Sequence, residues 1–107
     1  MTALDGVDLI RLAAFGERRG VQVISDTPEA RLVLFSLQGG QKASGRGEPR
    51  VHLLALEGEG ELWCGERRLA ATAGTLLACE AGDAHGARAG EGPFLVLGII
   101  TPRPSST

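Results

Sequence analysis

The sequence predicts an all-β fold, a closed barrel or a pair of packed sheets, and three observations carry that prediction. The chain has 107 residues, of which 16 are glycine. Most of these glycines stand in turn-like positions between short apolar runs, the rhythm of antiparallel strands joined by tight turns. No long helical period interrupts the rhythm. About nine short strands and no long helix are therefore expected, and a barrel or double sheet is their economical arrangement.

The expected elements follow one another closely along the chain. Residues 4–15 satisfy neither the helical nor the strand period, so a short helix and an edge strand both stay open there. An irregular strand or loop is expected at residues 42–50, which are polar and rich in glycine and proline. The clearer strands are expected at residues 21–25, 30–37, 51–56, 61–64, 67–69, 75–79 and 94–100.

Four glycines are expected to reverse one strand into the next. A tight turn between antiparallel strands needs residues that tolerate a positive φ. The glycines at these positions are Gly58, Gly65, Gly74 and Gly82.

Length and composition predict a single domain over residues 1–107, with a core from 20 to 101 and a flexible tail at 102–107. Apolar residues make up 43% and charged residues 22%, which is ordinary globular usage. The net charge is −2 and the basic residues are scattered along the chain, so no nucleic acid partner is expected. No apolar run approaches the roughly 20 residues of a spanning helix, and the first residues lack the layout of a signal peptide. A cytoplasmic protein without a membrane partner is expected.

The two cysteines, Cys64 and Cys79, do not form a CxxC pair. In a reducing cytosol two lone thiols usually stay reduced, and small buried thiols mostly serve core packing. Core packing is therefore expected for both, with a role as soft ligands beside His85 as the weaker alternative.

Two glycine-centred patterns connect the chain to a known family. Gly40 and Gly58 are followed, after fifteen residues, by Gly74, with Gly82 and His85 beyond it. This spacing from Gly39 to Ala89, with the run LEGEGE at residues 56–61, resembles the two motifs of small single-domain bacterial cupins, the cupin-2-like conserved barrels. The resemblance implies a double-stranded β-helix, or jelly-roll barrel, of the RmlC-like cupin type.

The first motif departs from the family where a metal would bind. Cupins hold a divalent metal with two histidines and a glutamate of the first motif and one histidine of the second. Those positions correspond here to Arg46, Glu48, Val51 and His85, so only the last imidazole is kept, and Glu80 replaces a proline of the second motif. One imidazole and one carboxylate fall short of the three protein ligands of a usual catalytic metal. Neither a metal nor another cofactor is expected.

A ligand site is expected at the barrel mouth from His85, Arg46 and Glu48. Arg46 and Glu48 lie two residues apart and share a face if the stretch is extended, where Arg46 can grip a carboxylate or phosphate. The alternatives are a solvated loop pair and, for His85, a polar residue bonded to backbone. Strand alternation puts Val51 and His52 on opposite faces, so His52 is expected to face outwards.

The expected function is binding of a small anionic molecule inside the barrel, without a tightly bound metal. The alternative is a metal-dependent cupin enzyme, of the dioxygenase or isomerase type, with an atypical ligand set around His85 and Glu48. Metal-free acid–base catalysis by His85 is a third possibility, and the fold does not decide among them. Trp63 and His52 on outward positions, together with sheet edges to protect, predict a homodimer.

Overall fold

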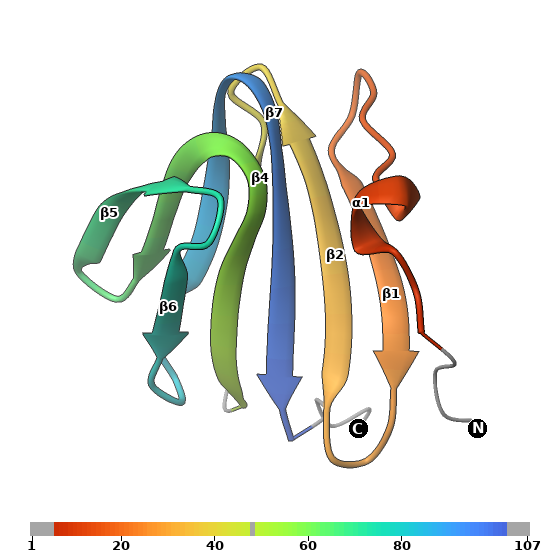
Figure 1. Cartoon of the computed structure of the whole chain (residues 1–107). Helices are drawn as coiled ribbons and strands as arrows, with labels where there is room; N and C mark the ends of the chain where they lie inside the picture. Colours follow the sequence, from red (N-terminus) through yellow and green to blue (C-terminus); the bar gives the residue numbers. More distant parts are fainter. Residues whose placement is uncertain (1–5, 48, 103–107) are drawn as a thin grey trace.

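The computed structural model describes residues 6–47 and 49–102 and confirms the all-β prediction (Figure 1). A short helix lies within the ambiguous N-terminal segment, and the Asp8 side chain caps it by accepting from the backbone N–H groups of Ile10 and Arg11. No helix in the described part of the chain is long and apolar enough to cross a membrane. The elements are α1 (Leu9–Leu12), β1 (Gly20–Asp26), β2 (Arg31–Gln38), β3 (Lys42–Gly45), β4 (Arg50–Cys64), β5 (Arg67–Thr72), β6 (Leu76–Cys79) and β7 (His85–Thr101).

Two long strands, β4 and β7, build both layers of the barrel. The main strand order is β1-β2-β7-β4-β5, with β3 paired to β7 and β6 paired to β4, and all pairs are antiparallel. The first half of β4 and the second half of β7 lie between β6 and β2 in a front layer. Their other halves lie between β5 and β3 in a back layer.

Two glycine-rich stretches that were expected to end strands are bends inside strands. β4 continues through residues 57–60 and β7 through residues 90–93, so the described residues form seven strands rather than about nine. Gly58 has φ +84° and faces β7 so closely that a Cβ there would collide with the carbonyl oxygen of Pro93. The chain does turn back in this region (Figure 1), but within one strand, so the prediction that one strand ends there and another begins is wrong. The other three glycines do have positive φ at turns, at 58° for Gly65, 96° for Gly74 and 89° for Gly82.

The core lies between the two layers and is made of the inward-facing residues of both. Val51 is 4% exposed within this core, whereas His52 is half-buried and pairs with Ile99 and Ala78 on the outer face of the front layer. The predicted alternation of these two residues is confirmed. The core residues are Leu37, Ala43, Val51, Leu53, Ala55, Leu62, Cys64, Ala71, Leu77, Cys79, Ala87, Ala89, Phe94 and Val96.

Trp63 lies on the outer face of the back layer, as the alternation with buried Leu62 and Cys64 predicts. Its indole covers Gly86, where a Cβ would collide with the ring. The Arg68 guanidinium lies 4.9 Å above the ring centroid and also donates to Glu61 at 2.8 Å. A cation over an indole face is favourable, so local residues of the same sheet cover this aromatic side chain.

The expectation of two free thiols is wrong, because Cys64 and Cys79 form a disulfide. The end of β4 and the end of β6 meet at one end of the barrel, with the two Cα atoms 5.3 Å apart and each residue 1% exposed. The bond therefore ties the back layer to the front layer. Disulfides persist mainly in oxidising compartments, so the cytoplasmic location expected from the sequence stays a prediction.

Candidate functional site

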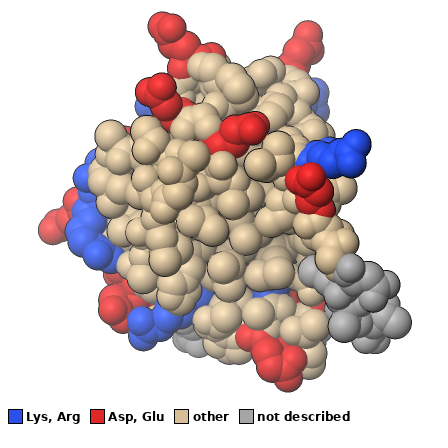
Figure 2. Space-filling view, in the orientation of Figure 1, with Lys and Arg blue, Asp and Glu red and all other residues tan. Residues whose placement is uncertain are grey.

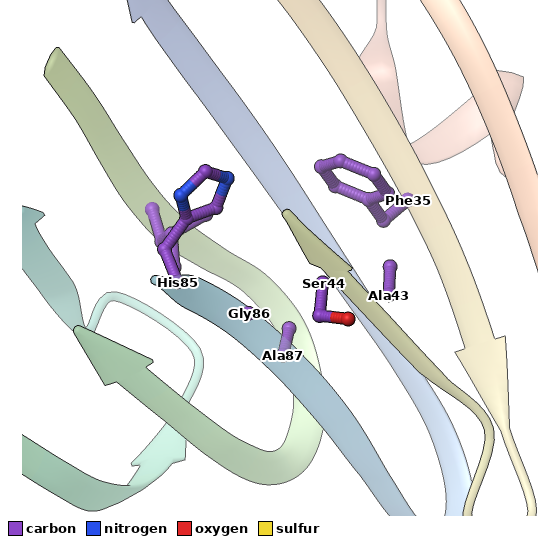
Figure 3. A pocket seen from close by; sticks show the side chains of 7 residues that line it. Phe35, Ala43, Ser44, His85, Gly86 and Ala87 are labelled. Carbon is purple, nitrogen blue, oxygen red and sulfur yellow. The ribbon is translucent and has the colours of Figure 1, made fainter. Parts of the chain in front are cut away.

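A small cavity opens between the two layers beside β3 and the start of β7 (Figure 3). Its volume is about 50 Å³. This is room for a few water-sized groups, well below the roughly 300–1,000 Å³ of sites that enclose a drug-sized ligand. Its walls are mostly apolar, and they are formed by Phe35, Ala43, Ser44, Leu53, His85, Gly86 and Ala87.

His85 is the ionisable residue in this wall. It begins β7, opposite Gly45 of β3 and Cys64 of β4, and it alternates inwards with the buried Ala87. Its ring points into the space that the Phe35 ring faces from β2 (Figure 3). Within residues 6–47 and 49–102, no group forms a hydrogen bond with the imidazole. Both ring nitrogens are therefore available to a bound molecule.

Because Gly45 has no side chain, the His85 ring can lie directly against it. A Cβ built on Gly45 would lie 3.2 Å from Nε2 and 3.4 Å from Cε1 of the imidazole. Contacts this short require the neighbour to shift by a few tenths of an ångström. The missing side chain at this position thus sets how closely the ring approaches β3.

The three residues that were expected to line one cavity do not all lie in its wall. His85 lines the cavity, and Arg46 is exposed directly after β3, outside the cavity wall. Glu48 lies outside the described residues. The carbonyl oxygen of Gly47 accepts a hydrogen bond of 2.9 Å from the backbone N–H of Gly82. This bond holds the neighbouring Arg46 near the end of the barrel where β7 begins. Arg46 therefore does not line this cavity, and contacts of Arg46 and Glu48 with a molecule at its mouth stay a prediction.

Two large apolar wall residues, Phe35 and Leu53, were not singled out from the sequence. Strand alternation does assign both to inner faces, since Phe35 pairs with Val96 and Leu53 with Gly98. Which inward residues border a void depends on how the two layers pack, and one strand's pattern carries no information on that.

Solved structures that resemble this chain settle its fold. The TT1209 protein of Thermus thermophilus superposes with a TM-score of 0.87 at 28% identity, over 94% of this chain and 100% of that one. A Klebsiella pneumoniae protein with a double-stranded β-helix domain gives a TM-score of 0.84 at 19% identity, over 97% and 95% of the two chains. An RmlC-like cupin protein of Desulfovibrio desulfuricans gives 0.69 at 25% identity, over 95% and 94%. This chain has the cupin fold.

The likeness of this chain to other proteins lies in its structure. No family model matches the sequence, and no curated protein matches it. The fold agrees with the glycine spacing of the two motifs, and the residues of the site rather than the fold determine its chemistry.

The donor set of this chain does not fit the divalent metal that the family resemblance implies. Among the described residues, no group of three or more His, Cys, Asp or Glu side chains is placed to hold a metal ion. The position of the family's glutamate is taken by Val51, which is buried in the core. The two thiols near the start of β7 are bonded to each other. His85 is therefore the one family metal ligand that the described residues retain.

Proposed function

We propose that this cupin binds a small organic anion, with the anionic group against the His85 ring. The observation that supports this is an imidazole facing an apolar cavity with no hydrogen-bond partner among residues 6–47 and 49–102. His85 is partly exposed, so a molecule from solvent can reach the ring and supply the hydrogen-bond partner. The cavity of about 50 Å³ suits a carboxylate-sized group, with the rest of the molecule at the mouth.

Arg46 is the second contact in this proposal. It is exposed and follows Gly45, the residue over which the His85 ring lies. A guanidinium offers paired N–H donors that match a carboxylate, so Arg46 can close over an anion held by the imidazole. We keep Glu48 as the third contact, an acceptor for a hydroxyl or ammonium group on the same molecule.

The metal-dependent enzyme remains the competing proposal, with His85 and Glu48 as its ligands. Two protein ligands are fewer than the three of a usual catalytic site. Elemental analysis of the purified protein separates the two proposals. Anion binding by a metal-free protein favours ours, and stoichiometric iron, manganese, nickel or zinc favours the enzyme.

His85→Ala is expected to weaken acetate binding about tenfold, because a hydrogen bond to a charged group contributes about 1.5–3 kcal/mol. The chain has two histidines, and each imidazole has two carbon-bound protons, so NMR gives one pair of signals for each histidine. Acetate titrated into the protein should move the His85 signals and leave the His52 signals in place.

His52→Ala is the matched control, since this ring lies on the outer face of the front layer. It should bind acetate like the unchanged protein. A response of the His52 signals alone, or equal affinities of the His85→Ala variant and the unchanged protein, would count against the site.

We also propose that a second copy of this chain covers the outer face of the front layer. Leu76, the most exposed large apolar residue of the described chain at 58%, pairs there with Leu54, and His52 pairs with Ile99. Figure 2 shows that the centre of this face carries no Lys, Arg, Asp or Glu, which gather around its margin. An apolar centre with a charged rim is the usual layout of an interface between protein chains.

Leu76→Glu is expected to convert the dimer into a monomer, because it places a charge on the exposed apolar surface of this face. A stable dimer should bury at least about 1,000 Å² in total, and light scattering at tens of micromolar protein measures its mass. The matched control is Val23→Glu, which alters a residue 56% exposed on β1 whose cross-strand partner is Val33, on the inner side of the layer. A monomeric unchanged protein, or a dimer that survives Leu76→Glu, would refute this interface.

A further inference from the structure

A groove lined by cations lies on the surface beside the start of β3, away from the His85 cavity. Its volume is about 460 Å³, and it is lined by Arg18, Arg19, Gln41 and Lys42. The two arginines precede β1, and Lys42 begins β3. Arg19 and Lys42 are 23 positions apart in the chain, so the sequence alone does not reveal this cluster.

The loop that carries the two arginines is held in place by hydrogen bonds. The carbonyl oxygen of Gly16 accepts from the side-chain amides of both Gln38, at 3.0 Å, and Gln41, at 2.9 Å. The Arg19 guanidinium donates to the carbonyl oxygen of Lys42 at 3.2 Å, which joins the two sides of the groove. Positioning charges before a ligand arrives lowers the entropy lost on binding.

A fourth cation, Arg88, lies directly opposite Lys42 in the β3–β7 ladder. Like charges in this position destabilise a sheet. Glu61 faces Arg88 from the other side, but its carboxylate is bonded to Arg68 at 2.8 Å. Within the described residues, Arg18, Arg19, Lys42 and Arg88 form no ion pair.

We propose that this groove binds a small polyanion of the polyphosphate or phosphate-ester class. Guanidinium groups bind phosphate oxygens in pairs, and an ammonium adds a point charge beside them. The groove is wide open to solvent, and walls of charged and amide side chains favour a hydrated, multiply charged ligand. Unpaired cations in a chain of net charge −2 supply the complementary field. The exposed Glu17 does not line the groove.

Titration calorimetry with pyrophosphate tests this site on the whole chain. The double variant Arg19→Gln/Lys42→Gln should bind at least about tenfold more weakly, because it removes two charge-assisted contacts. The matched control, Arg11→Gln/Arg67→Gln, removes the same net charge elsewhere and should lose less than about twofold, the effect of distant screened charges. His85→Ala should leave pyrophosphate affinity unchanged. The proposal for this groove is therefore tested independently of the proposal for the anion site in the barrel.

Lys42→Glu separates loss of binding from loss of folding. It should abolish pyrophosphate binding and yet raise Tm by about 2–4 °C, because it sets a carboxylate opposite Arg88 in place of a second cation. Absence of binding to the unchanged protein at millimolar pyrophosphate would overturn the proposal. Equal losses in the two double variants, or tighter binding of a hexaglutamate peptide than of pyrophosphate, would overturn it as well.

Discussion

Gly58→Ala is expected to lower the free energy of unfolding by about 3 kcal/mol, through backbone strain and a clash that cannot relax easily. Gly58 has φ +84°, and an added Cβ would overlap the carbonyl oxygen of Pro93, a backbone atom of the paired strand β7. Relief requires the two central strands to separate at the bend where both pass from one layer to the other. Urea denaturation followed by circular dichroism measures the loss.

Gly74→Ala is the matched control for this substitution. Gly74 also has a positive φ, 96°, but no atom lies within 4 Å of the Cβ position. Only the backbone preference is lost there, about 1–2 kcal/mol. If both variants lose the same stability, the close approach of Pro93 to Gly58 does not constrain the barrel.

Breaking the Cys64–Cys79 bond is expected to lower the free energy of unfolding by about 3 kcal/mol, the chain-entropy value for a loop of about 15 residues. The sequence separation is 15, and the bond joins the two layers at one end of the barrel. Urea denaturation with and without a thiol reductant measures the difference. The loss comes mainly from the greater freedom of the reduced unfolded chain.

The double variant Cys64→Ala/Cys79→Ala should unfold at one midpoint whether or not reductant is present. It controls for effects of the reductant on the rest of the molecule. Two reactive thiols in the unchanged, denatured protein without reductant would show that the cysteines are free, as the sequence predicts, and would contradict the bond.

Local sequence patterns were sufficient to predict the properties that depend on neighbouring residues. Alternation along a strand determines which side of the sheet a residue faces. It correctly predicted that Val51 and His52 face opposite sides and that Trp63 faces outwards. Positive φ is a local demand as well, so the turns at Gly65 and Gly74 could be predicted from glycine alone.

The properties that depend on strand pairing could be seen only in the folded barrel. A glycine can reverse a strand or bend it, and at Gly58 the continued pairing with β7 selects the bend. Cys64 and Cys79 meet because the two layers close on each other, and the small size of the His85 cavity follows from the same packing. The arginines before β1 lie beside Lys42 because the strands between them fold back on each other. These contacts join residues far apart in the chain, and local sequence patterns do not encode which distant segments pair.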